Sequence, residues 1–222
     1  MGRWPVALPE PLSAVVLAAG QGVRLGGVLK PLIRIDEQPI VCRLAQSLMA
    51  VGIGRIVVVL GPHTRPVRQT MAQLPAMRGA DVSWVEVAPG SDQMHSLRQG
   101  LLALAGASCG ALVCLADQPL IDAPALHALC ETHAQRPPGT DMLVPTVGER
   151  PGNPVVLSAR LVQEWQGLDE SRIGKRWRDA HPQRVHRWHT TCSAYTTDLD
   201  TPQDLDALRQ AGLAVALPAI TP

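Results

Sequence analysis

The chain has 222 residues, a length that suits one α/β domain with a sizeable hydrophobic core. Hydrophobic residues make up 46% and charged residues 18%, and the formal net charge of +1 gives no global attraction to nucleic acid or to a membrane surface. Five cysteines without a C-x-x-C pair argue against a disulfide framework and favour a reducing cytoplasm. The N-terminus lacks the apolar core of a signal peptide, and no apolar run has the length of a membrane span.

Apolar, β-branched runs alternate with helical patterns along most of the chain. Strands are expected at 13–18, 55–60, 81–87, 110–116, 141–145 and 153–158. Helices are expected within 38–52, 91–106, 122–134 and 200–212. The last three helices begin at polar capping residues, which are Ser91 or Asp92, Asp122, and Asp200 or Thr201.

This alternation predicts an α/β fold, with one domain built on a mostly parallel sheet that helices cover on both faces. We expect an N-terminal extension at 1–12, the domain at 13–213 and a loose C-terminal tail at 214–222. In such sheets, ligands bind beyond the carboxyl ends of the strands. Three segments are therefore candidates for a site: the loop after Ala18, the residues after Leu115, and the segment before the last helix.

The first of these segments is a glycine-rich loop within VVLAAGQGVRLGGVLKPL, at 15–32. Glycines allow backbone amides to approach an anion closely, and Arg24 and Lys30 can neutralise phosphate oxygens. A tight turn with solvated charges is the alternative. The glycine spacing is one residue too long for a dinucleotide-binding fingerprint, and no hydroxyl residue follows Lys30 as it would in a P-loop.

Two aspartates belong to the other candidate segments. Asp117 comes directly after a buried run and before Pro119, so it suits either a Mg²⁺ ligand at the end of a strand or a turn residue. Asp200 stands in an Asp-Thr-Pro sequence, which is typical of a helix start. The residues alone leave both alternatives open.

The glycine loop resembles the nucleotidyltransferase signature L-A-A-G-x-[GS]-x-R-[FLM]-G-x-x-x-K, through Leu17, Ala18, Ala19, Gly20, Arg24, Gly26 and Lys30. This is the signature of the MobA-like family, which includes molybdenum cofactor cytidylyltransferase, the nearest resemblance, and molybdopterin guanylyltransferase. Other segments are similar to motifs of the same family in the same order: SLRQGL at 96–101, LADQPLI at 115–121, GNPVVLS at 152–158 and DLDTPQDL at 198–205. A G-D-x-G-x-R segment of the family is matched only loosely, within 167–177.

The resemblance implies a Rossmann-like nucleotidyltransferase fold and a set of site residues. Arg24, Lys30 and Asp117 would be catalytic. Asp117 and Asp200 would hold Mg²⁺, or Mn²⁺ in its place, with Asp198 the less favoured choice. The residues implied to bind the nucleotide are Leu17, Ala18, Ala19, Gly20, Gly22, Arg24, Lys30, Ser96 and Arg98.

The implied acceptor is a phosphorylated pterin-type molecule, bound by Asn153, Lys175 and Arg176. The stretch 172–189 holds these two basic residues among others, and a solvated basic face is the equally weighted alternative. The implied reaction, of the EC 2.7.7 class, moves CMP from CTP onto the phosphate of molybdopterin and releases pyrophosphate. A molybdoenzyme apoprotein would be a further partner, with no nucleic acid or membrane involved, in the cytoplasm.

Three other functions stay open. The first is GTP-dependent guanylyl transfer to molybdopterin, and Ala19 discriminates here because the guanylyl branch usually has glycine at this position. The second is cytidylyl transfer to a small phosphorylated alcohol. The third is a non-catalytic nucleotide-binding accessory protein for molybdoenzyme maturation.

Overall fold

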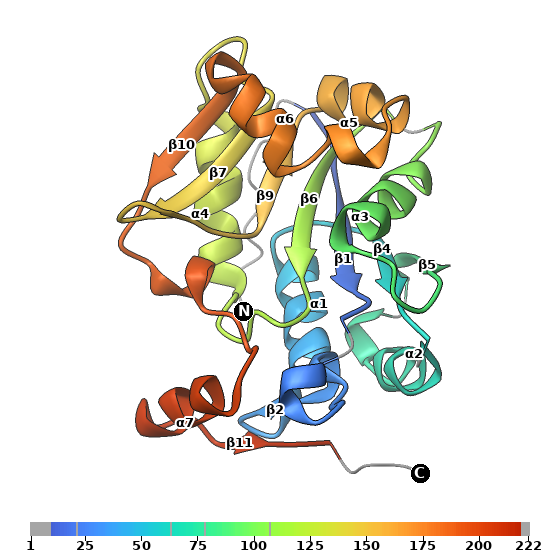
Figure 1. The fold of residues 1–222 in the computed structure, drawn as a ribbon, viewed down its shortest axis with the longest axis vertical. Helices are drawn as coiled ribbons and strands as arrows, with labels where there is room; N and C mark the ends of the chain where they lie inside the picture. Colours follow the sequence, from blue (N-terminus) through green and yellow to red (C-terminus); the bar gives the residue numbers. More distant parts are fainter. Residues whose placement is uncertain (1–9, 21, 63, 78, 107, 219–222) are drawn as a thin grey trace.

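A mostly parallel sheet divides the molecule into two helical layers (Figure 1). The structure is a computed structural model that describes residues 10–20, 22–62, 64–77, 79–106 and 108–218. The strand order is β10-β7-β9-β6-β1-β4-β5, with β8 paired to β7. These strands are β1 (Leu12–Ala18), β4 (Arg55–Leu60), β5 (Asp81–Glu86), β6 (Gly110–Leu115), β7 (Met142–Val147), β8 (Arg150–Pro151), β9 (Val155–Leu157) and β10 (Val185–His189).

The helices lie on both faces of this sheet, as expected. One layer contains α1 (Ile40–Ala50), α2 (Thr64–Ala72) and α4 (Ala123–Ala134), and the other contains α3 (Gln93–Leu102), α5 (Ala159–Gln166) and α6 (Lys175–Ala180). The chain also forms α7 (Pro202–Gln210) and the short 3-10 helices η1 (Val23–Leu25), η2 (Lys30–Leu32), η3 (Pro75–Met77), η4 (Glu170–Arg172), η5 (Pro182–Arg184) and η6 (Ser193–Thr196). Within the described residues, no helix is long and apolar enough to cross a membrane.

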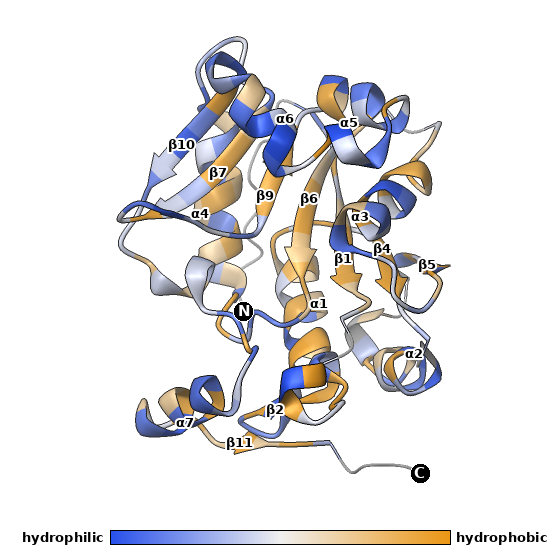
Figure 2. Cartoon of the chain, viewed as in Figure 1, coloured by the Kyte–Doolittle hydropathy of each residue, from blue (hydrophilic) through white to orange (hydrophobic). Residues whose placement is uncertain are grey.

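Strand β1 shows why the central strands read as continuous apolar runs. Ala14 and Val16 point into the layer of α1, α2 and α4, while Val15 and Leu17 point into the opposite layer. All four side chains are buried because successive residues of a strand face opposite sides of the sheet. Because helices cover both faces, the central strands β1, β4 and β6 are mainly hydrophobic, which Figure 2 shows in orange.

The predicted strand at 153–158 forms as β9, but it runs antiparallel to both of its neighbours, β6 and β7. The remaining pairs of the central strands β10–β7, β6–β1, β1–β4 and β4–β5 are parallel. The predicted helix starts are confirmed at Asp92, Asp122 and Thr201, whose side chains accept hydrogen bonds from the first turn of α3, α4 and α7.

A small second sheet, in the order β11-β2-β3, corrects the prediction of a loose tail. Its strands are β2 (Arg34–Ile35), β3 (Gln38–Pro39) and β11 (Val215–Ala216). Residues 215–216 therefore belong to the folded domain, whereas 219–222 lie outside the described residues. The sheet and α7 bury a separate apolar cluster, which consists of Leu25, Val28, Ile33, Ile35, Ile40, Leu199, Leu205 and Leu208. This cluster fastens the C-terminal segment to the segment that follows the glycine loop.

Candidate active site

The three segments singled out from the sequence meet at one cavity of about 440 Å³. It lies where β1 and β6 end, because parallel neighbours present their carboxyl ends at the same edge of the sheet. Its lining is Leu17, Ala19, Gly20, Ser91, Asp92, Gln93, Ser96, Leu115, Asp117, Asn153, Asp198 and Asp200. The start of α3 supplies one wall, and the segment before α7 supplies another.

Lys30 joins two of these segments. Its Nζ donates hydrogen bonds to Oδ1 of Asp200, at 2.5 Å, and to Oδ2 of Asp117, at 3.2 Å. The residue is buried, although it carries a charge. Its backbone is fixed because Lys30 begins η2, Pro31 follows, and the Lys30 carbonyl accepts a hydrogen bond from the N–H of Ile33.

Asp200 is available to Lys30 because the neighbouring residue caps the helix. The Thr201 side chain accepts from the N–H of Asp204, and the Asp204 carboxylate accepts from the N–H of Thr201 in return, which is a capping box. The Asp200 side chain is thus left to face the cavity. The sequence alone could not distinguish these roles, because Asp200 and Thr201 are both typical helix-capping residues.

Asp198 also lines the cavity. It and Asp200 lie on either side of the fully buried Leu199, and alternate residues of an extended segment share a face. Oδ1 of Asp198 is buried and accepts no well-formed hydrogen bond from the described residues. Burial raises the pKa of this carboxyl, and a weak contact with the Gln118 side chain partly opposes the rise. The resemblance to the family made Asp198 the less favoured metal ligand, but it lines the cavity as Asp200 does.

The charges in the cavity are strongly coupled. Burial lowers the pKa of Lys30, but the hydrogen bond to Asp200 and the charges of Asp117 and Asp200 outweigh it, so the net shift is upward and the ammonium stays charged. Burial raises the pKa of Asp117 against the opposing effect of Lys30. Burial and the negative charges of Asp117 and Asp200 raise the pKa of Asp198.

The donor set fits a hard cation. The three aspartates offer only oxygen ligands, which Mg²⁺ and Mn²⁺ prefer, and one of those oxygens is buried without a well-formed hydrogen bond from the described residues. In the part of the chain that the structure describes, no three His, Cys, Asp or Glu side chains are grouped closely enough to hold a metal by themselves. In proteins, Mg²⁺ is commonly bound by one or two carboxylates, and substrate phosphates and waters complete its shell.

The conformation of the glycine loop requires a glycine at position 22. This residue has a φ of 58°, and a Cβ added there would lie 2.1 Å from the carbonyl oxygen of Val28. The Gly22 carbonyl in turn accepts hydrogen bonds from the N–H groups of Leu25 and Gly27. Arg24, in η1, is exposed, and neither it nor Gly22 lines the cavity.

The other residues expected to bind the nucleotide are divided. Leu17, Ala19, Gly20 and Ser96 line the cavity, whereas Ala18 is buried beneath it in the core. Arg98 does not line the cavity, and its Nε donates a 2.9 Å hydrogen bond to the carbonyl of Leu168. Ser91, Asp92, Gln93 and Leu115 line the cavity but were not singled out from the sequence, where they read as a helix start and a strand end.

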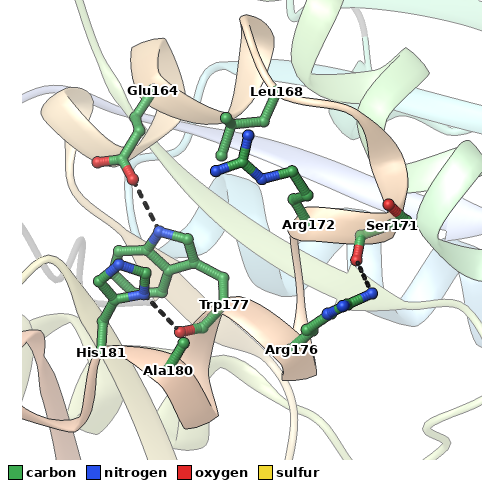
Figure 3. A pocket seen from close by; sticks show the side chains of 8 residues that line it. All are labelled: Glu164, Leu168, Ser171, Arg172, Arg176, Trp177, Ala180 and His181. Atoms are coloured by element: carbon green, nitrogen blue, oxygen red, sulfur yellow. Dashed lines mark hydrogen bonds between the residues drawn. The ribbon is translucent and has the colours of Figure 1, made fainter.

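The residues expected to bind the acceptor occupy two adjoining hollows. Asn153 lines the cavity itself, whereas Lys175 and Arg176 line a hollow of about 640 Å³ that shares Asp92 with it. Arg176 also borders a third hollow, of about 440 Å³, beside the buried Trp177 (Figure 3). The ring of Trp177 is already stacked on His181, with centroids 4.5 Å apart.

The segment 168–174 packs against the start of α3. His95 Nδ1 lies 2.9 Å from Oε2 of Glu170, and a Cβ added at Gly174 would meet the sulfur of Met94 at 2.2 Å. The same helix start lines the cavity. One short stretch of α3 therefore separates the two hollows and contacts both.

The Rossmann-like fold and the acid-lined cavity place the protein in the class of nucleotidyltransferase folds. Residues 14–185 match the family of the MobA-like NTP transferase domain, and the chain belongs to this family. The match ends before Asp198 and Asp200.

One curated relative is similar over most of the chain. The bifunctional protein GlmU of Rhodospirillum rubrum is 34% identical over 158 residues, which are 71% of this chain and 33% of that protein. The chain thus spans about a third of the length of this curated relative.

Solved structures share the fold along most of the chain. Rv0371c from Mycobacterium tuberculosis H37Rv has a TM-score of 0.68 and 25% identity, covering 90% of this chain and 98% of its own. A complex of Rv0371c with manganese has a TM-score of 0.67 and 23% identity over 90% of this chain and 99% of that one. A nucleotidyl transferase from Methanothermobacter thermautotroptrophicus has a TM-score of 0.66 and 22% identity over 90% of this chain and 96% of its own.

Proposed function

We propose that the protein transfers a nucleoside monophosphate from an NTP to a phosphorylated acceptor and releases pyrophosphate. The observation that carries this proposal is the contact of Lys30 with both Asp117 and Asp200, beside a cavity that the glycine loop also lines. Such a cavity offers cations and backbone amides to a triphosphate, and carboxylates to the metal ion that accompanies it. Membership of an NTP transferase family supports the same reaction.

In this reaction, a phosphate oxygen of the acceptor attacks the α-phosphorus of the NTP in line, and the bond to the bridging oxygen breaks as pyrophosphate leaves. Lys30 neutralises the charge that grows on the leaving pyrophosphate, and the backbone at Ala19 and Gly20, which line the cavity, contacts the phosphates. Arg24 lies in the same loop outside the cavity and would have to turn toward the phosphates to add its charge. The protein needs no general base, because the acceptor phosphate is already ionised. Its contribution is positioning and charge neutralisation.

Mg²⁺, or Mn²⁺ in its place, supplies charge neutralisation at the α-phosphate when it is bound. Asp117 and Asp200 hold the ion, and Asp198 is a third oxygen donor in the same cavity. With all three acids ionised, Lys30 leaves two negative charges uncompensated, which one divalent cation balances. The manganese complex of Rv0371c supports a divalent cation in this fold.

For the nucleotide, we favour CTP over GTP. We expect the base to lie against the backbone of Leu17 to Ala19. Leu17 and Ala19 line the cavity, and the methyl group of Ala19 takes space that a glycine would leave free. GTP-dependent guanylyl transfer is the second candidate, and it would require that this methyl group tolerate the larger base.

For the acceptor, we favour a phosphorylated pterin such as molybdopterin, delivered afterwards to a molybdoenzyme. The hollow with Lys175 and Arg176 adjoins the cavity through Asp92, so a molecule whose phosphate reaches the cavity can extend toward these basic residues. A small phosphorylated alcohol would use only the cavity itself, beside Asn153. A non-catalytic accessory protein would bind the nucleotide there without turnover.

The test is to incubate the protein with Mg²⁺ and each of the four NTPs, with and without molybdopterin, and to follow pyrophosphate release. The proposal predicts release that requires molybdopterin, with CTP the preferred nucleotide. A parallel series replaces molybdopterin with a small phosphorylated alcohol. Release that requires the alcohol and not molybdopterin would identify the alcohol as the acceptor, and Mg²⁺-dependent NTP binding without release in either series would favour the accessory protein. The same assay compares Asp117→Asn, which removes a carboxylate from the cavity, with Asp206→Asn, which removes one from an exposed position of α7 and should leave release unchanged.

A further inference from the structure

We propose that Lys30 is an internal counter-cation that occupies the metal-binding carboxylates until a metal–nucleotide complex replaces it. This inference rests on the nucleotidyl transfer proposed above and concerns the order of binding at the same site. It predicts that the free protein binds a divalent cation weakly, and that the phosphates of the nucleotide release the carboxylates by taking the ammonium.

The geometry of Lys30 carries the argument. Its Nζ lies within hydrogen-bond distance of one oxygen from Asp117 and one from Asp200, at 3.2 and 2.5 Å. Asp117 follows β6, and Asp200 precedes α7, so a single ammonium links two separate segments. A cation bound to the same oxygens and the ammonium between them exclude each other by charge and by space.

The residue type supports this role. The chain contains 18 arginines and only two lysines, Lys30 and Lys175. A lysine ammonium is a compact point charge, whereas a guanidinium is a planar fork of donors. A compact, strongly hydrated charge is the side-chain group that most resembles a metal ion between two carboxylates. Of the two lysines, Lys30 is buried and Lys175 is exposed.

The exchange requires movement of the side chain alone. The backbone of Lys30 is held by the turn of η2 and by Ile33, which is fully buried in the cluster beneath the small sheet. The ammonium is carried on a flexible four-carbon chain, so it can move while the backbone stays in place. When the ammonium leaves the carboxylates, the negatively charged groups within reach are the phosphates in the cavity, where the proposed mechanism requires a cation.

The first experiment measures Mn²⁺ affinity by electron paramagnetic resonance for the wild type, Lys30→Met and Lys30→Arg, without nucleotide. Lys30→Met should bind Mn²⁺ at least about tenfold more tightly than the wild type, because it lacks the competing charge. Lys30→Arg should stay as weak as the wild type. Arg24→Met, which removes a cation from the same loop, should change the affinity little, because Arg24 does not contact the carboxylates.

The second experiment uses the wild type and does not depend on a variant that folds. With only two lysines, acylation of each can be followed by mass spectrometry, and Lys175 serves as the internal reference. Lys30 should react slowly in the free protein. Saturating Mn²⁺ alone should raise its rate several-fold relative to Lys175, and Mn²⁺ with a non-hydrolysable CTP analogue should lower it again.

Equal Mn²⁺ affinity in the wild type and in Lys30→Met, or an unchanged acylation rate at saturating Mn²⁺, would overturn the inference and leave the proposed transfer intact. Failure of the wild type and of all variants to bind Mn²⁺, even with the CTP analogue present, would overturn both proposals together.

Discussion

The backbone N–H of Leu199 donates a 2.9 Å hydrogen bond to the carbonyl oxygen of Asp117. This bond joins the segment before α7 to the residues after β6, and the Leu199 side chain is fully buried in the cluster beneath the small sheet. Asp198 and Asp200 flank Leu199 on the cavity side. One apolar residue therefore sets the position of two acids relative to the third.

Leu199→Ala tests this relationship. The substitution should lower the free energy of unfolding by about 2–5 kcal/mol, because it leaves a cavity beside Leu205 and Leu208. It should also lower transfer activity under conditions where the protein is still folded, since Asp200 loses its support. Urea unfolding and turnover are measured together. Leu208→Ala is the control in the same cluster, and an equal loss of activity there would show that stability alone explains the effect.

Asp117→Asn keeps the shape of the side chain but removes the charge that would hold the metal. Activity should fall by about 10²–10³-fold, and the Mg²⁺ concentration for half-maximal activity should rise. Burial raises the pKa of Asp117 in the metal-free protein, so acidification should weaken metal binding at a higher pH than it would at an exposed aspartate. A variant with normal turnover and a lower melting temperature would make Asp117 a turn residue only.

The nucleotide preference is expected to depend on Ala19. A difference of one methyl group at the base is worth about 1–3 kcal/mol, or roughly 10–200-fold in discrimination. Ala19→Gly should therefore relax a preference for CTP toward GTP without reversing it. The measurement is the ratio of kcat/KM for the two nucleotides in both proteins, and a wild-type ratio in favour of GTP would move the protein to the guanylyl reaction.

A buried histidine that does not line the cavity, His133, should control stability in acid. Burial and the charge of Arg136 lower the pKa of His133 to about 4 against the opposing charge of Glu10, whose Oε1 lies 3.3 Å from the imidazole Nε2. The unfolded chain then binds more protons between pH 6.5 and about 4, so this contribution to stability is present above 6.5 and is lost as the pH falls toward 4.

The loss should amount to a few kcal/mol, on the order of 1.4 for each pH unit over that interval. Urea midpoints across this range are compared for the wild type and His133→Gln. The variant should show a shallower decline, and His189→Gln, on the exposed side of β10, should decline as the wild type does. Parallel declines for all three proteins would mean that other groups set the acid limit.

Most of the fold could be predicted because the strands are buried on both faces. Val15 and Val16 lie in opposite helical layers, so β1 reads as an unbroken apolar run, and the helix caps at Asp92 and Asp122 use common capping chemistry. The antiparallel direction of β9 could not be predicted, because three residues between short turns carry no signal of direction.

The site was predictable to the extent that local patterns define it. Asp117 and Lys30 were expected from a strand end and a glycine loop. Their direct contact, at 3.2 Å, could not be expected, since it depends on a packing cluster formed by residues from both ends of the chain. The loop sequence alone is typical of an exposed lysine, whereas the structure buries Lys30. For Arg98, a matching motif was not enough to predict the contact. It belongs to the SLRQGL segment at 96–101, but its Nε donates a hydrogen bond to the carbonyl oxygen of Leu168.

The measurement that tests the account most directly follows the two ends of the triphosphate separately, with Lys30→Ala as the comparison. CTP labelled at the α-phosphate and CTP labelled at the γ-phosphate are incubated with Mg²⁺ and molybdopterin. If the protein transfers a nucleoside monophosphate, the α-label should appear in the acceptor and the γ-label should leave as pyrophosphate in equal amount. Lys30→Ala should lower both by at least about 100-fold. Transfer of the γ-label to the acceptor, or equal α-label transfer by the wild type and Lys30→Ala, would contradict the account.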